Sequence, residues 1–146
     1  MTLLASGSSV LFSADCVTLW SGFTLNEGLA TLRILVVDDD RLVRAAMVRT
    51  LQSFPAVVVE DFSLGEDAIV RLDAASFDVA VLDLKMPTID GVDLAVQLTK
   101  KLPALRIIFV SADLCGDIAR RARALDPHAL LPKPWPSGEL ARLIRS

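Results

Sequence analysis

The sequence has few of the residues on which several classes of protein depend. Only two cysteines, Cys16 and Cys115, occur in 146 residues, and neither has the spacing of a metal-binding motif. We therefore expect a reduced protein without a disulfide framework, in which both cysteines are small buried or half-buried residues. The single histidine, His128, stands alone in a predicted loop, so no catalytic role is expected for it.

Long apolar runs and excess positive charge are also missing. No stretch reaches the roughly 20 apolar residues that a membrane-spanning helix needs. The formal net charge is -3, which argues against broad nucleic-acid binding, because such binding requires clustered basic side chains. These absences predict a soluble cytoplasmic protein that binds neither nucleic acid nor membrane directly.

The first thirty residues differ from the rest because they contain no lysine or arginine. A secretory signal would begin with basic residues followed by a continuous apolar run, and this segment has neither. Its apolar residues fit neither a helical nor a strand period well. We assign residues 1–31 to an N-terminal extension, for which three alternatives stay open: a disordered tail, a segment that docks on the domain or on a partner, and translated sequence upstream of the native protein.

From Leu32 onward, short apolar runs alternate with amphipathic stretches. This alternation is typical of repeated βαβ units around a parallel sheet. The runs consist almost entirely of Val, Ile and Leu, which indicates strands covered by helices on both faces. Five strands are predicted, at 33–37, 57–60, 79–82, 106–110 and 129–131, each followed by a helix. In the first helix we expect an apolar stripe of Val43, Ala46, Met47 and Thr50.

One proline helps to choose the strand order. Pro132 directly follows the last predicted strand and lacks a backbone N–H, which an edge strand tolerates better than a central one. An order of 2-1-3-4-5 places the fifth strand at an edge and the first and third side by side. The expected fold of residues 32–146 is therefore a doubly wound, five-stranded parallel α/β sheet, a flavodoxin-like three-layer sandwich.

Reactive side chains follow four of the predicted strands. Asp38 and Asp39 come after the first strand, Asp83 after the third, Ser111 after the fourth, and Lys133 two residues after the fifth. Parallel strands end at one edge of a sheet, where open α/β sheets bind ligands, so these side chains are expected to converge there.

A cluster of carboxylates needs positive charge. Two carboxylates about 4 Å apart repel by roughly 4 kcal/mol at an effective dielectric constant near 20. We expect Lys133 and a Mg²⁺ ion to offset this repulsion, because Mg²⁺ prefers a few carboxylate oxygens and several waters. In such a site a carboxylate can attack a phosphoryl group and form an acyl phosphate.

Residues 32–145 resemble the receiver domain of two-component response regulators. The resemblance depends on several motifs that occur in the right order on the right predicted elements. They are Asp38-Asp39 after two valines, Asp83 in Leu-Asp-Leu-Lys-Met-Pro followed by Ile89-Asp90-Gly91, Ser111-Ala112, and Lys133-Pro134.

The resemblance implies a role for each acidic residue. Asp83 would be the phosphoacceptor, which takes a phosphoryl group from a phosphohistidine of a sensor histidine kinase or a phosphotransfer protein. Asp39 would bind Mg²⁺ directly, and Asp38 would act mainly through water or by positioning. Asp83 and the backbone carbonyl of Lys85 would complete the protein ligands of the metal.

It also implies how the phosphoryl group is held and sensed. Lys133 would pair with the phosphoryl oxygens, and a cis Lys133–Pro134 bond is expected. Ser111 would hydrogen-bond the phosphoryl group and move on binding it. The side chain of Lys85 is expected to tune the attack of water on the acyl phosphate.

Leu130 departs from the family, which usually has Tyr or Phe three residues before the lysine. Leucine lacks the ring, so output is expected to run through backbone or packing shifts of the fourth helix. A downstream protein target or a second copy of the chain would bind the fourth and fifth helices. Five arginines are candidates for a basic face there: Arg120, Arg121, Arg123, Arg142 and Arg145.

The chain ends soon after the fifth predicted helix, so we expect a single-domain signalling protein that catalyses only its own phosphorylation and dephosphorylation. Two alternatives are a degenerate receiver that acts as a constitutive interaction module, which Leu130 favours mildly, and a phosphatase of the haloacid dehalogenase type. The second is suggested by Asp38 and Asp40, an Asp-x-Asp pair, but it would leave Asp83 unexplained. For Asp40 we expect the role of a helix cap.

Overall fold

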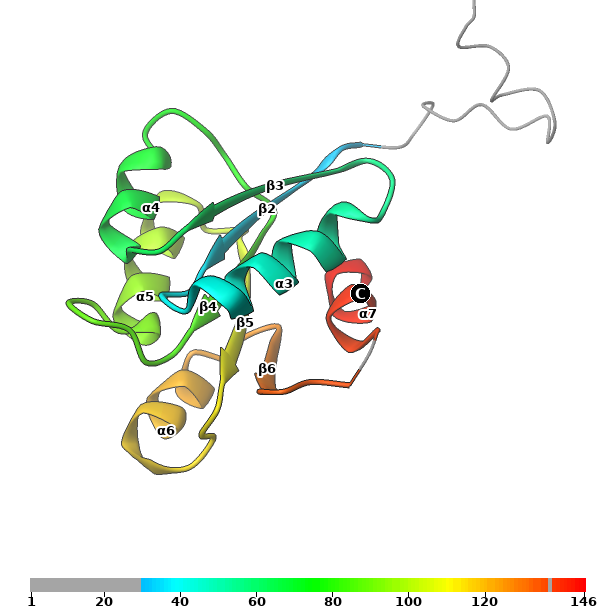
Figure 1. Ribbon diagram of the computed structural model, residues 1–146. Helices are drawn as coiled ribbons and strands as arrows, with labels where there is room; N and C mark the ends of the chain where they lie inside the picture. Colours follow the sequence, from blue (N-terminus) through cyan, green and yellow to red (C-terminus); the bar gives the residue numbers. More distant parts are fainter. Residues whose placement is uncertain (1–29, 137) are drawn as a thin grey trace, which may run out of the picture. The chain divides into compact units, whose positions relative to one another are not determined.

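The computed structural model describes residues 30–136 and 138–146. Most of the predicted extension at 1–31, including Cys16, therefore lies outside the described residues. Within these residues, strands and helices alternate strictly along the chain (Figure 1). The elements are β2 (Leu32–Val37), α3 (Arg41–Gln52), β3 (Val57–Phe62), α4 (Gly65–Arg71), β4 (Val79–Asp83), α5 (Gly91–Lys101), β5 (Arg106–Ser111), α6 (Gly116–Ala124), β6 (Ala129–Pro132) and α7 (Glu139–Arg145).

The five strands form one parallel sheet in the order β3-β2-β4-β5-β6, which is the predicted order 2-1-3-4-5. The central strands β2 and β4 pair from Ile34 opposite Val79 to Val37 opposite Leu82, so they end side by side. The last strand continues one residue beyond its predicted end and includes Pro132. Because β6 is an edge strand with a neighbour on one side only, the missing N–H is tolerated there.

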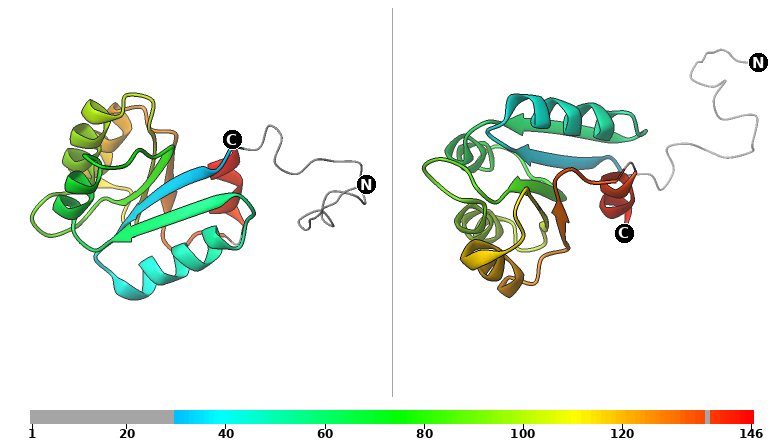
Figure 2. Two further views of the ribbon diagram at one scale, coloured as in Figure 1. Left: turned by 90° about the horizontal axis from the view of Figure 1, so that it is seen from above. Right: turned by 60° about the horizontal axis from the view of Figure 1, so that its bottom comes forward.

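Helices cover both faces of the sheet (Figure 2). Successive side chains of a strand point to opposite faces. Leu35 and Leu82 accordingly pack against α4, α5 and α6, whereas Ile34 and Val81 pack against α3 and α7. The central strands are buried on both faces, which explains why they show no polar alternation.

Two expectations about single residues are wrong. Ala46 is exposed, and Leu51 is fully buried in its place, because α3 turns Met47 and the residue one turn later toward the sheet. Cys115 is exposed at the start of α6 instead of buried. In the part of the chain that the structure describes, every helix is too short or too polar to cross a membrane.

Candidate functional site

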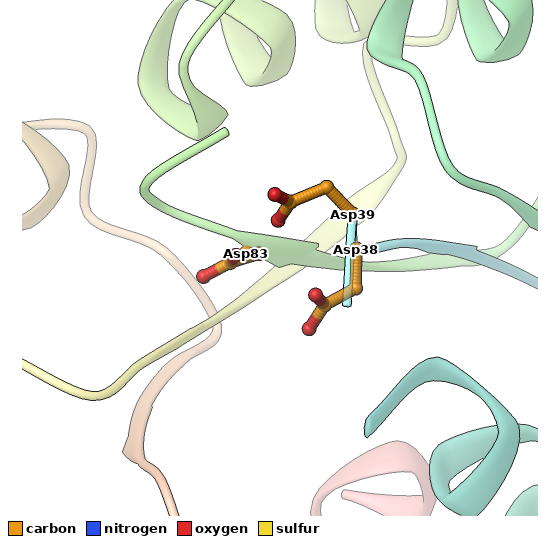
Figure 3. Close-up of side chains that lie close together, drawn as sticks. All are labelled: Asp38, Asp39 and Asp83. Atoms are coloured by element: carbon orange, nitrogen blue, oxygen red, sulfur yellow. The ribbon is translucent and has the colours of Figure 1, made fainter. Parts of the chain in front are cut away.

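The ends of β2 and β4 bring three aspartates together (Figure 3). Asp38 and Asp39 follow β2, and Asp83 is the last residue of β4. One carboxylate oxygen of each lies within 4.8 Å of the others. Asp38 is fully buried and Asp83 is 6% exposed, whereas Asp39 is open to solvent. This set of oxygens on one side of a sheet edge suits a hard divalent cation that keeps part of its water shell.

Lys133 supplies the positive charge of the cluster. Its Nζ lies 2.8 Å from Oδ2 of Asp38 and 3.4 Å from Oδ1 of Asp83. Burial alone would lower the pKa of the ammonium, but the hydrogen bond to Asp38 and the charges of both aspartates raise that pKa above its ordinary value. Lys133 is therefore charged at neutral pH, and it offsets one of three negative charges.

The backbone aims Lys133 into this position. Its N–H donates to the carbonyl of Ser111 at 2.8 Å, one residue beyond the end of the β5–β6 pairing. The Lys133–Pro134 peptide bond is cis, as predicted.

Asp83 is electrostatically strained. Its burial and the nearby charge of Asp38 raise the pKa of its carboxyl group from 3.8 to about 6, although Lys133 and the backbone N–H of Lys85 act in the opposite direction. The group is thus mostly a carboxylate at pH 7, although its burial and the charge of Asp38 raise the free energy of the charged form. Any cation that binds beside it lowers the free energy of the charged form.

Asp38 is fixed in place from several sides. Its Oδ1 accepts the N–H of Asp40 at 2.9 Å, while its Oδ2 accepts from Lys133. Its backbone carbonyl accepts from Nη1 of Arg44 at 2.7 Å, and the same guanidinium pairs with Asp61 at 2.9 Å. The role of Arg44 could not be predicted from the sequence, because only the packing of α3 beside β3 brings these groups together.

Asp40 is a helix cap, as predicted. Its carboxylate accepts the N–H groups of Leu42 and Val43 at 2.9 and 3.1 Å at the start of α3. The carboxylate is therefore engaged with the helix rather than paired with Asp38 across a metal site. This geometry weakens the dehalogenase-type alternative.

The hydroxyl of Ser111 is bonded to its own loop. Ser111 is 1% exposed, and its Oγ donates to the carbonyl of Asp113 at 2.9 Å and accepts the N–H of Asp113 at 3.2 Å. The side chain of Asp113 also pairs with Nζ of Lys85 at 3.3 Å, which joins the loops after β4 and β5. The role of Asp113 was not predicted from the sequence, although Ser and Asp both commonly accept the N–H two residues further on in turns, as Ser111 does from Asp113 and Asp113 does from Cys115.

Leu130 lies on β6 opposite Phe109 and is half-buried. It packs against the core on the side of α4, α5 and α6. Its side chain offers contact but no hydrogen bond to neighbouring groups.

The arginines of α6 and α7, which were candidates for a basic face, are largely paired within the domain. Local acids or carbonyls engage most of them, because neighbours one turn apart and the adjacent α5 carry carboxylates. The partners are Asp117 for Arg120, Asp90 and Asp93 for Arg121, the carbonyl of Leu114 for Arg123, Glu139 for Arg142, and the ring of Phe54 for Arg145.

Comparison with known proteins identifies relatives of this arrangement. Residues 34–145 match the family model described as "Response regulator receiver domain". The chain is 32% identical to a protein-glutamate methylesterase/protein-glutamine glutaminase of Rhodospirillum rubrum, over 75% of this chain and 29% of the relative. It is 37% identical to the response regulator MprA of Mycolicibacterium vanbaalenii, over 79% of this chain and 49% of the relative. The chain thus spans half or less of these curated relatives.

Solved structures show the same fold. A CheY-like response regulator receiver domain protein from Methanospirillum hungatei superposes with a TM-score of 0.74 at 22% identity, covering 80% of this chain and 92% of that one. At this identity the likeness is evidence for the fold alone.

Proposed function

The chain belongs to the response regulator receiver family, and from this premise we propose that Asp83 accepts a phosphoryl group from a sensor histidine kinase or a phosphotransfer protein. The main support is the position of Asp83, a strained carboxylate at the centre of an acidic cluster beside Lys133. In the proposed step, a carboxylate oxygen attacks phosphorus and a new P–O bond forms. The P–N bond to the donor histidine breaks, and its electron pair returns to the imidazole ring.

The hydrogen bonds favour Asp83 over Asp38 as the nucleophile. Both oxygens of Asp38 already accept hydrogen bonds, from Asp40 and Lys133, and its side chain is fully buried. Asp83 is slightly exposed, and its contact with Lys133 is longer, at 3.4 Å. A phosphoryl donor from solvent therefore reaches Asp83 with fewer bonds to break.

We propose that Mg²⁺ is the cofactor, held by Asp39, Asp83 and the backbone carbonyl of Lys85, with Asp38 acting through water. The residues fit the ion, because three carboxylates and one ammonium leave two negative charges uncompensated. When bound, Mg²⁺ would neutralise charge on the phosphoryl oxygens. Lys133, which already lies between Asp38 and Asp83, would pair with a further phosphoryl oxygen.

Ser111 is proposed as the residue that senses the phosphoryl group. Its hydroxyl must leave the backbone of Asp113 before it can donate to a phosphoryl oxygen on Asp83. That exchange of partners would move the loop that precedes α6. In this chain Leu130 cannot add the hydrogen bond of a tyrosine, so output would depend on the loop and on α6.

The proposed setting is cytoplasmic, and the proposed output is contact with a protein target or a second copy through α6 and α7. A degenerate receiver that works as a constitutive interaction module is the second candidate. Leu130 is the observation that favours it.

Intact-mass spectrometry after incubation with acetyl phosphate and Mg²⁺ tests the proposal. The parent is expected to gain one phosphoryl group, and this gain should disappear with a chelator and in Asp83→Asn. Asp40→Asn is a matched control, because asparagine caps a helix as well as aspartate does. It should be phosphorylated like the parent.

An adduct that persists in Asp83→Asn would refute the assignment of the nucleophile. If the parent neither gains mass nor binds beryllofluoride in the presence of Mg²⁺, the constitutive interaction module becomes the better description.

A further inference from the structure

Helix α6 has a weaker apolar attachment to the sheet than the other long helices. Its fully buried residues are two alanines, Ala119 and Ala122. By contrast, α5 buries Val92, Leu94 and Leu98. Because an alanine removes far less apolar surface from water than a leucine does, polar contacts carry a larger share of what holds α6 in place.

One arginine supplies most of these polar contacts. Nη1 of Arg121 lies 3.1 Å from Oδ2 of Asp90, and Nη2 lies 2.7 Å from Oδ1 of Asp93. Both acids belong to the start of α5, where Asp90 also accepts the N–H of Asp93 as the helix cap. The guanidinium therefore binds two carboxylates at once, with the fork geometry that lysine lacks.

Asp90 is connected mechanically to the candidate phosphorylation site. The next residue, Gly91, is pressed against the strand end so closely that a Cβ there would lie 2.3 Å from the carbonyl oxygen of Asp83. Its N–H donates to the carbonyl of Leu84 at 2.9 Å. A backbone shift at Asp83 would therefore press directly on Gly91, the residue that follows Asp90.

A second arginine ties α6 to the other loop beside the site. Nη2 of Arg123 donates to the carbonyl of Leu114 at 2.8 Å. Leu114 follows Asp113, whose backbone holds the hydroxyl of Ser111. Consequently α6 is bonded both to the loop after Asp83 and to the loop after Ser111.

We propose that Arg121 couples the site to α6, and that its bridges to Asp90 and Asp93 stabilise the arrangement in which Ser111 is bonded to Asp113. The inference builds on the proposed function, since it says how that site controls its output helix. A phosphoryl group that draws Ser111 away from Asp113 would have to move the start of α6 against these bridges. Arg121 is a positioning residue, and it takes over coupling that Leu130 cannot provide through a ring.

Thermodynamic linkage makes the coupling measurable in both directions. If the bridges favour one arrangement of α6, their removal must favour the other, and the affinity of the site for a phosphoryl mimic that binds the other arrangement must rise by up to the same factor. Exposed ion pairs of this kind contribute enough for an effect of about three- to tenfold.

The test measures beryllofluoride affinity with saturating Mg²⁺ by calorimetry, and hydrogen exchange of α6 amides without beryllofluoride. Arg121→Ala is expected to bind beryllofluoride about three- to tenfold more tightly than the parent and to exchange its α6 amides faster by a similar factor. Arg121→Lys should give a smaller shift, because a single ammonium cannot bind both acids. Asp90→Asn keeps the helix cap and should shift the affinity in the same direction.

Arg120→Ala is the matched control. Arg120 is the preceding residue of α6 and pairs only with Asp117 of the same helix among the described residues. It should leave both readouts unchanged. In the double variant Arg121→Ala/Asp90→Asn the two effects on beryllofluoride affinity should not add, because each change removes the same Arg121–Asp90 ion pair.

The outcomes separate this inference from the proposed function. Parent-like affinity of Arg121→Ala, or additive effects in the double variant, would overturn the coupling role while phosphorylation at Asp83 stands. A parent that fails to bind beryllofluoride would overturn both. Thermal unfolding of each variant shows whether a shift in affinity reflects loss of the fold.

Discussion

Two clusters of charged residues in this domain differ in which charge is in excess: cations outnumber carboxylates in one, and carboxylates outnumber cations in the other. In the Glu60 cluster, one carboxylate on β3 is shared by two cations, Arg71 at 2.7 Å and Arg33 at 3.2 Å. In the Asp83 cluster, three carboxylates share one lysine. The hydrogen bond from Arg71 lowers the pKa of Glu60, despite the opposing effect of burial, whereas burial and the charge of Asp38 raise that of Asp83.

The difference shows what each cluster contributes. A carboxylate with a lowered pKa stabilises the folded state near neutral pH, and one with a raised pKa destabilises it. The Glu60 cluster holds the edge strand β3 against its neighbours. The Asp83 cluster destabilises the folded state in the absence of a cation, and in the proposed function a bound cation or the transfer of a phosphoryl group would relieve this destabilisation.

Removing Lys133, the one cation that the described residues place against Asp38 and Asp83, should have the largest effect. Lys133→Met leaves Asp38 buried without its partner, and we expect a loss of about 3 kcal/mol in the free energy of unfolding at pH 7. Urea unfolding measures it. Lys101→Met is the control, because Lys101 pairs with Asp73 on the surface and its loss should cost less than about 1 kcal/mol. Equal losses in the two variants would contradict the comparison.

Removing the carboxylate of Asp83 should increase the free energy of unfolding, the opposite of the effect of removing Lys133. Without metal at pH 7, Asp83→Asn is expected to stabilise the fold by about 2–3 kcal/mol, since a rise in the folded pKa from 3.8 to about 6 corresponds to roughly 3 kcal/mol. The folded state binds this proton more tightly than the unfolded state. The destabilisation that the Asp83 carboxylate causes in the parent therefore disappears as pH falls from 7 through 6 toward 4.

Unfolding midpoints of both proteins across this range measure the effect. The advantage of Asp83→Asn should shrink steadily on acidification. A constant advantage would mean that shape or packing, and not charge, accounts for it.

The same change in the Glu60 cluster should destabilise. Glu60→Gln is expected to cost about 0.5–1 kcal/mol at pH 7, because both cations lose a charged partner. Glu60 has a folded pKa below 4.5, so its contribution is present above that pH and is lost as pH falls through the folded pKa. A gain in stability, as predicted for Asp83→Asn, would remove the distinction between the clusters.

The smallest effect concerns the open side of the Asp83 cluster. Lys85 and Asp113 form an exposed pair across it, and Lys85→Ala is expected to shorten the lifetime of the acyl phosphate about two- to threefold by admitting water. Decay of the phosphorylated mass after removal of acetyl phosphate measures this, with Arg120→Ala as the control. Equal lifetimes would show that Lys85 does not tune hydrolysis.

The features that the sequence predicts best are those that depend on the spacing of apolar residues along one element or on a single proline. The five strands, their order with β6 at the edge, and the meeting of Asp38, Asp39, Asp83 and Lys133 were all predictable. Parallel strands of buried apolar residues must end at a common edge, so residues far apart in sequence converge there. The cap formed by Asp40 depends only on local spacing and was predicted for that reason.

Helix rotation was harder to predict. Ala46 and Leu51 lie on either side of Met47 around the helix, about 100° and about 40° away from it, and the rotation of α3 decides which of the two faces the sheet. Cys115 is exposed because it lies in the turn that begins α6, and composition alone cannot indicate that place.

The sequence alone determined the layered fold and the convergence of the acidic residues and Lys133, because apolar period and strand order are encoded locally and repeated along the chain. Only the tertiary structure decided the partners of Ser111, Arg44 and Arg121. Each partner depends on a side-chain rotamer and on the packing of separate elements, such as those that carry Asp90 and Arg121, 31 residues apart. Such choices differ by small free energies, and they are settled only when every neighbouring group is in place.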